Sequence, residues 1–63
     1  MVTYYLLDKN NKRKDKFVAY SDIAAEYNTT RNAVAGKFYR AEHENNSQII
    51  TLNGDRIERV RSI

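Results

Sequence analysis

The dipeptide Asn53-Gly54 restricts the fold of this chain more than any other feature of its sequence. It separates two runs rich in isoleucine, leucine and valine. Asparagine and glycine both adopt positive φ at low cost, which a two-residue hairpin turn requires. The dipeptide therefore predicts a hairpin in which Ile50 pairs with Ile57 and both side chains share one face of a sheet. In this register Val60 falls on the opposite face unless a bulge intervenes.

A second hairpin is expected at the N-terminus. Val2–Leu7 and Lys16–Tyr20 are rich in aromatic, β-branched and aliphatic residues, which is typical of strands. The segment between them contains Asn10 and Asn11, which tolerate the left-handed backbone of a tight turn. Residues 9–16 include five basic side chains and one acidic side chain. Such a cluster suits a polyanion, although it also occurs as a solvated charged loop.

Between the hairpins the sequence predicts two helices, the first of them short. Ser21 offers an N-cap for this helix. Asn28 closes it, because asparagine accepts the left-handed conformation that ends many helices. The apolar residues recur at helical spacing and form one face, made by Ile23, Ala24 and Tyr27.

The second helix is expected over residues 31–44. Thr29 or Thr30 can cap its start, and the polar run at 45–47 ends it. Its apolar residues recur at helical spacing and predict a face turned towards the core, made by Val34, Phe38 and Ala41.

The expected fold is a single α+β domain over residues 1–63, a small winged helix-turn-helix in the order β-β-α-α-β-β. A chain of this length has a small core, and no cysteine is present to add a disulfide or a thiolate-metal site. His43 alone cannot hold zinc, and no nucleophile–base pair or carboxylate pair has a catalytic spacing. We therefore expect no cofactor, no metal and no enzymatic activity. Without a membrane-spanning run or a signal peptide, a cytoplasmic protein with no membrane contact is expected.

Residues 21–40 meet the physical requirements of a helix-turn-helix. The first helix needs a small residue at the point where the second helix crosses it, and Ala24 is such a residue. Val34 follows Tyr27 by seven residues and anchors the second helix in the core. Thr29 departs from the pattern, because such motifs usually place an aliphatic residue there. An ordinary antiparallel or crossed helix pair is the alternative.

The exposed residues of the second helix favour DNA as a partner. Arg31 and Asn32 lie in its first turn, where they can pair bidentately with guanine and adenine in the major groove. Gly36 costs about 1 kcal/mol relative to alanine within a helix, which favours a role in close approach. The candidate base-contacting residues are Thr30, Arg31, Asn32, Ala35 and Gly36. The candidate phosphate-contacting residues are Lys12, Arg13, Lys14, Lys16, Lys37, Tyr39 and Arg40.

The helix pair resembles a known DNA-binding family. The octet Thr30–Lys37 closely resembles the T-R-N-A-V-I-G-K recognition-helix motif of GcrA-type bacterial cell-cycle regulators. Ile23–Glu26 is similar to the I-A-x-x-L first helix of the same motif, with Tyr27 in place of the leucine. The resemblance covers a third of the chain. It implies recognition of double-stranded DNA in the major groove and contact with the transcription machinery.

The order of the elements is similar to a second group, the small DNA-binding repeats of intron-encoded homing nucleases. In those repeats a hairpin that begins with a Tyr-Tyr-x-x-Asp-like stretch leads into a Ser-capped helix-turn-helix. Thr3–Asp8 and Tyr20–Ala25 fit that order. This resemblance implies DNA binding without nuclease chemistry, because the sequence has no acidic cluster or histidine pair to hold a metal.

The C-terminal hairpin has two open interpretations. As a wing, it would bring Arg56, Arg59 and Arg61 to a minor groove or to phosphates. Alternatively, it covers the helix pair and completes the core. Asp55 and Glu58 weaken a phosphate contact and favour this second interpretation.

We expect a double-stranded DNA-binding protein that acts as a small bacterial or phage-type transcriptional regulator. One recognition helix alone binds weakly, so we expect a further partner. This partner is RNA polymerase, another host protein or a second copy of the chain in a homodimer. With about six phosphate contacts, affinity should fall roughly a thousandfold between about 50 and 200 mM salt. The alternative is a small phage-type protein-interaction factor that binds a host protein. Its contact residues would be Tyr4, Tyr5 and Val18, with the helix-turn-helix as a scaffold.

Overall fold

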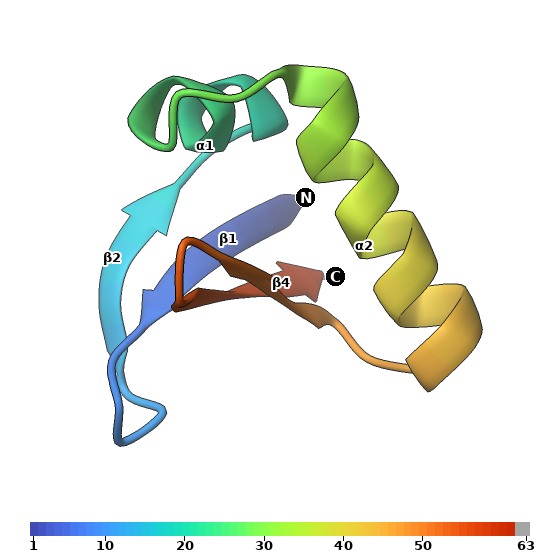
Figure 1. The fold of residues 1–63 in the computed structure, drawn as a ribbon. Helices are drawn as coiled ribbons and strands as arrows, with labels where there is room; N and C mark the ends of the chain where they lie inside the picture. Colours follow the sequence, from blue (N-terminus) through green and yellow to red (C-terminus); the bar gives the residue numbers. More distant parts are fainter. Residues whose placement is uncertain (62–63) are drawn as a thin grey trace.

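The computed structural model describes residues 1–61, which form one four-stranded sheet and two helices (Figure 1). The elements follow the order β-β-α-α-β-β, so the predicted α+β class and element order are confirmed. In chain order they are β1 (Val2–Leu7), β2 (Arg13–Phe17), α1 (Tyr20–Glu26), α2 (Arg31–Asn45), β3 (Ile49–Leu52) and β4 (Asp55–Arg61).

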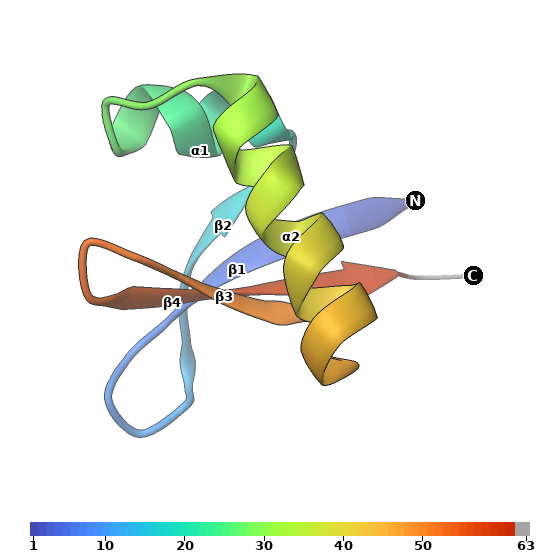
Figure 2. The ribbon, with the colours of Figure 1, turned by 45° about the vertical axis from the view of Figure 1, so that its right-hand side comes forward.

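The sheet joins the first strand of the chain to the last. Its strands lie antiparallel in the order β2-β1-β4-β3, so each hairpin forms one half of the sheet. β1 pairs with β4 across the middle, where Leu6 lies opposite Ile57. Both helices cover the same face of the sheet, and in the described chain no helix covers the other face (Figures 1 and 2).

The C-terminal hairpin has the predicted turn and register. Asn53 and Gly54 have φ values of 50° and 83°. Ile50 pairs with Ile57, and both are buried in the core. β4 pairs with β1 without a register shift, so Val60 lies on the opposite face and is half-buried. No bulge in β4 therefore moves Val60 to the face that carries Ile57.

The second strand of the N-terminal hairpin lies earlier in the chain than predicted. We expected a strand over 16–20, but β2 spans 13–17 and the chain leaves the sheet after Phe17. Phe17 enters the core, whereas Val18 is 74% exposed. β2 is an edge strand, and its charged residues face solvent, which discourages pairing with other chains. The predicted strand over 16–20 is wrong because Tyr20 belongs to the next helix.

Helix α1 begins at Tyr20, so the prediction that Ser21 caps it is wrong. The N-cap is Ala19, which makes no side-chain capping hydrogen bond. The ring of Tyr20 packs against the rings of Tyr4 and Phe38, with centroid distances of 5.0 and 5.6 Å. Burial of a large aromatic ring contributes more than a cap, which is worth about 1 kcal/mol. Packing therefore sets the start of this helix.

Helix α2 begins as predicted and ends one residue later, at Asn45. The Thr30 hydroxyl oxygen accepts a hydrogen bond from the Ala33 amide at 3.1 Å, which identifies Thr30 as the N-cap. Asn46 has a left-handed backbone with φ of 50° and ends the helix. The predicted core residues of this helix are all buried, namely Val34, Phe38 and Ala41.

The core lies between the sheet and the two helices. Tyr4 packs against Phe38 with a ring-centroid distance of 5.6 Å and is 7% exposed. Burial raises the pKa of Tyr4 to about 12. Tyr4 is therefore not available for the protein contact considered above, whereas Val18 and the half-buried Tyr5 reach the surface. The largest fully buried side chains among residues 1–61 are Ile23, Val34, Phe38 and Ile57.

Candidate nucleic-acid interface

Helices α1 and α2 cross at a steep angle and are joined by the turn at residues 27–30 (Figures 1 and 2). Asn28 has φ of 53°, the left-handed conformation that the sequence predicts. The Thr29 amide donates a hydrogen bond to the Ala24 carbonyl at 2.9 Å. Ala24 itself is buried, as expected of the small residue in this motif. The helices are thus a crossed pair and not an antiparallel hairpin.

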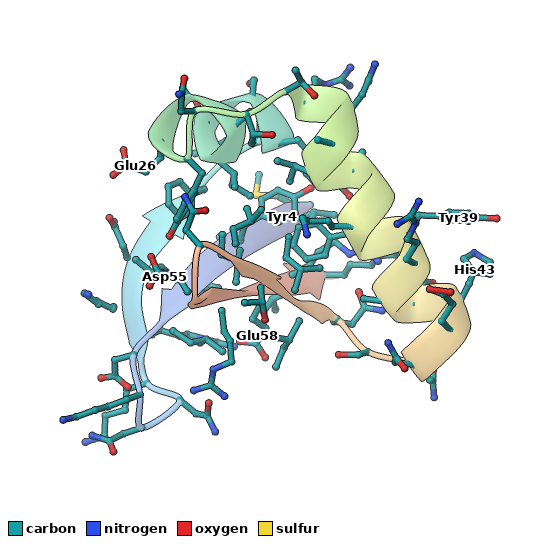
Figure 3. The ribbon with its side chains drawn as sticks, viewed as in Figure 1. Tyr4, Glu26, Tyr39, His43, Asp55 and Glu58 are labelled. Atoms are coloured by element: carbon teal, nitrogen blue, oxygen red, sulfur yellow. The ribbon has the colours of Figure 1, made fainter. Side chains whose placement is uncertain are left out.

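The exposed side of α2 gathers most of the predicted contact residues. Thr30 is exposed just before this side, and Ala35 is half-buried at its border. The ring centroids of Tyr39 and His43 lie 4.1 Å apart, and both side chains point away from the sheet (Figure 3). We call the exposed residues among positions 31–40 the outer face of α2: Arg31, Asn32, Ala33, Gly36, Lys37, Tyr39 and Arg40.

The first half of the outer face of α2 has low relief. Asn32, Ala33 and Gly36 are short residues, and all three are exposed. A Cβ on Gly36 would meet no atom within 4 Å, so packing inside the chain does not require glycine at this position. Glycine nevertheless costs about 1 kcal/mol relative to alanine within a helix. This stretch of α2 therefore lets another surface approach the helix backbone closely.

Three cations border the stretch of low relief. Arg31 lies at its start, and Lys37 and Arg40 follow in the next turns. Within residues 1–61 none of the three forms an ion pair with a carboxylate. Unpaired cations around a shallow surface produce a positive potential that attracts an anionic partner.

Arg59 is the only charged residue that is buried within the part of the chain the structure describes. Its guanidinium lies 5.2 Å from the centroid of the Phe38 ring. It donates hydrogen bonds to the Gln48 amide oxygen at 2.8 Å, the Tyr20 hydroxyl at 3.0 Å and the Glu42 carboxylate. The hydrogen bond from Arg59 lowers the pKa of Glu42. Arg59 therefore links β4 to both helices and fixes the position of α2 on the sheet.

The interpretation of Arg59 as a wing residue is wrong, because the residue is 9% exposed and its guanidinium is hydrogen-bonded inside the molecule. The sequence contained the signal for this. Arg59 follows Ile57 by two residues in a strand, so both side chains lie on the buried face. Arg56 is half-buried and donates to the Asp8 carbonyl at 3.1 Å, whereas Arg61 is exposed.

The turn of the C-terminal hairpin is attached to the turn between the helices. The Tyr27 hydroxyl donates a hydrogen bond to the Asp55 carboxylate at 2.9 Å. Burial, together with this hydrogen bond, raises the pKa of Tyr27 to about 12, so the hydroxyl remains a donor at neutral pH. Asp55 lies near the end of α1, on the side away from Tyr39 and His43 (Figure 3). The hairpin tip therefore supports the helix pair instead of flanking the outer face of α2.

The basic residues of the N-terminal hairpin lie away from α2. The β1–β2 turn projects from the lower left in Figures 1 and 2, whereas α2 lies on the other side of the sheet. The Arg13 guanidinium lies 3.4 Å from the Glu58 carboxylate and 4.3 Å from the centroid of the Tyr5 ring. The structure thus separates the predicted phosphate contacts into two groups. The hairpin group, all exposed, comprises Lys12, Arg13, Lys14 and Lys16.

The described residues show no sign of a metal centre or a membrane span. Within residues 1–61 no three histidine, cysteine, aspartate or glutamate side chains gather closely enough to hold a metal ion. No helix in this part of the chain is long and apolar enough to cross a membrane. No protein-family model, curated protein or solved structure matches the chain.

Proposed function

We propose that this protein binds double-stranded DNA by placing the outer face of α2 in the major groove, as a small helix-turn-helix domain. The observation that carries the proposal is the stretch of low relief at Gly36, exposed and without a packing role inside the chain. Arg31, Lys37 and Arg40 surround it without carboxylate partners among residues 1–61. Shape and charge on this face both suit a DNA groove.

The dimensions and chemistry of B-DNA explain why this face suits the major groove. That groove is about 12 Å wide and admits one α-helix. The short side chain of Asn32 and the absence of a side chain at Gly36 let the helix axis approach the base edges. Arg31 and Asn32 then read bases, and Lys37 and Arg40 hold phosphates. Because Arg59 fixes α2 on the sheet, the helix is held in place before DNA arrives.

We further propose a cytoplasmic bacterial or phage-type transcriptional regulator as the biological setting. This part rests on the octet Thr30–Lys37 and its resemblance to the recognition helix of GcrA-type regulators. A single recognition helix gives weak binding, so RNA polymerase, another host protein or a second copy of the chain would supply the remaining affinity at a promoter.

A fluorescence anisotropy titration with random duplex DNA at about 50 mM salt tests the proposal. We expect the unmodified protein to bind, and Arg31→Glu to weaken binding about tenfold or more, as loss of an arginine contact to guanine does.

The matched control is Arg61→Glu, the same substitution at an exposed residue outside both the outer face of α2 and the N-terminal hairpin. We expect this variant to keep its affinity within about threefold. Equal losses in both variants would mean that net charge, and not the outer face of α2, determines binding. If no duplex binds, the protein-interaction alternative becomes the leading one and is tested by a pull-down.

A further inference from the structure

The N-terminal hairpin carries a concentrated positive charge that the α2 site does not use. We call its five exposed basic residues the hairpin cluster: Lys9, Lys12, Arg13, Lys14 and Lys16. Among the described residues, none of the four lysines pairs with a carboxylate, and Arg13 alone contacts one, that of Glu58. Five like charges so close in the chain repel one another, so they are favoured where a polyanion neutralises them.

The acidic residues beside the hairpin cluster are engaged with the local backbone. The Asp8 carboxylate accepts hydrogen bonds from the Asn10 and Lys12 amides at 2.8 and 2.9 Å, which shapes the turn. The Asp15 carboxylate accepts one from the Lys16 amide at 2.8 Å. These carboxylates stabilise the hairpin backbone, and the lysine ammonium groups remain available at its surface.

The hairpin cluster and the outer face of α2 lie on opposite sides of the molecule (Figures 1 and 2). α2, the core and the sheet lie between them, and the molecule measures 26 × 25 × 25 Å along its principal axes. A straight duplex seated on the outer face of α2 therefore does not reach the hairpin cluster. At about 0.1 M salt the Debye length is about 10 Å, so two duplexes held on opposite sides scarcely repel each other.

The surface chemistry of the hairpin selects a duplex backbone over a single strand. Proteins that bind single-stranded nucleic acids combine a basic groove with exposed aromatic rings on which successive bases stack. On this side the ring of Tyr5 is already covered by the Arg13 guanidinium, 4.3 Å from its centroid. Lysine ammonium groups are point charges that contact phosphates without regard to sequence. A groove of about 520 Å³ between the two hairpin turns is lined in part by Lys9, Lys14 and Arg56, but the acidic residues Asp8 and Asp55 line it too, so the exposed lysines and not this groove carry the phosphate contacts.

We propose that the hairpin cluster binds the phosphate backbone of a second DNA duplex, so that one molecule bridges two duplex segments. The bridging rests on the proposed function, because α2 holds the first duplex. The hairpin site is argued separately, from the charge and position of its own residues.

A two-duplex capture experiment tests the bridge. One duplex is immobilised on beads, the protein is added, and capture of a second, fluorescent duplex is measured at about 50 mM salt. In the hairpin variant the four lysines of the cluster are changed to glutamine, which keeps their length and removes their charge. We expect this variant to bind the immobilised duplex within about threefold of the unmodified protein. Capture of the second duplex should fall about tenfold or more.

Mixing two variants distinguishes a bridge within one molecule from a bridge through dimers. Gly36→Gln disables the outer face of α2, and the hairpin variant disables the hairpin cluster. If one molecule carries both sites, the mixture does not restore capture. Restored capture would show that dimers make the bridge and would overturn the proposal.

Two further outcomes separate failure of this proposal from failure of the proposed function. If the hairpin variant loses affinity for a single duplex as strongly as Arg31→Glu does, both surfaces grip the same duplex and the second site is wrong. If Gly36→Gln leaves duplex binding unchanged while the hairpin variant abolishes it, the α2 proposal fails and the hairpin site stands. If the unmodified protein binds one duplex but does not capture the second, the bridging proposal is wrong and the proposed function stands.

Discussion

At the residue scale, Arg59 shows how a buried charge fixes the position of a surface helix. Arg59 is 9% exposed, and three hydrogen-bond acceptors from α1, α2 and the segment before β3 surround its guanidinium. A buried charge is tolerated only when such partners are present. The acceptors come from elements far apart in sequence, so this residue depends on the complete fold.

Replacing Arg59 should destabilise the protein. Arg59→Ala leaves the Tyr20 hydroxyl and the Glu42 carboxylate without their donor, and we expect the free energy of unfolding to fall by about 2 kcal/mol. Arg59→Lys should recover only part of this, because an ammonium group lacks the planar fork of donors. Urea denaturation followed by circular dichroism measures both changes. A loss below about 0.5 kcal/mol for the alanine variant would contradict this account of the network.

Glu42 should make the stability depend on acidic pH. The hydrogen bond from Arg59 lowers its pKa in the folded protein below the ordinary value of 4.5. A lowered pKa means that the carboxylate stabilises the fold above about pH 4.5 and that this contribution is lost as pH falls through the folded pKa. We therefore expect stability to fall below pH 4.5, and to fall less in Glu42→Gln. Thermal melting between pH 7 and pH 3 compares the two proteins; identical losses would count against the assigned role of Glu42.

At the element scale, the turns and the ends of α2 could be read from the sequence because single residues determine them. Asn11, Asn28, Asn46 and Asn53 all have positive φ, as a residue suited to left-handed backbone should. The boundary between β2 and α1 could not be read in this way. There, Tyr20 joins the helix because of its contacts with Tyr4 and Phe38, which exist only after the chain has folded.

The N-cap of α2 gives a prediction at this scale. Thr30→Ala removes the hydroxyl that accepts the Ala33 amide, and we expect a loss of about 1 kcal/mol in the free energy of unfolding. Thr30→Ser keeps the hydroxyl and should be nearly neutral. Chemical denaturation of the protein without DNA measures both. Equal stability in all three proteins would show that Thr30 does not cap the helix.

At the scale of the whole molecule, the sequence predicted the class and the order of elements but not the arrangement of the two halves. Pairing of β1 with β4 joins residues at opposite ends of the chain, and no local pattern specifies it. The same arrangement buries Arg59 and separates the hairpin from α2. The sequence therefore predicted every exposed residue of the outer face of α2 except Ala33 as a contact residue. It grouped the hairpin lysines with them because the separation of the two groups in space cannot be read from the sequence.

This separation changes the expected salt dependence. If only Lys37 and Arg40 neutralise phosphates of the first duplex, affinity should fall about twelvefold between about 50 and 200 mM salt. The six contacts expected from sequence alone correspond to roughly a thousandfold. Anisotropy titrations of one short duplex at several salt concentrations give the slope. A slope that corresponds to about six phosphate contacts would mean that the N-terminal hairpin contacts the same duplex as α2.

The comparison of Gly36→Gln with the unmodified protein tests the central claim most directly. The substitution adds bulk to the outer face of α2 without changing charge, and a Cβ there meets no atom within 4 Å. Because glutamine favours a helix more than glycine does, stability should rise by about 0.5–1 kcal/mol. Affinity for duplex DNA should nevertheless fall about tenfold or more, while Asn45→Gln, at the far end of α2, should leave it unchanged. If Gly36→Gln is more stable and binds DNA as tightly as the unmodified protein, α2 does not enter the major groove by this face.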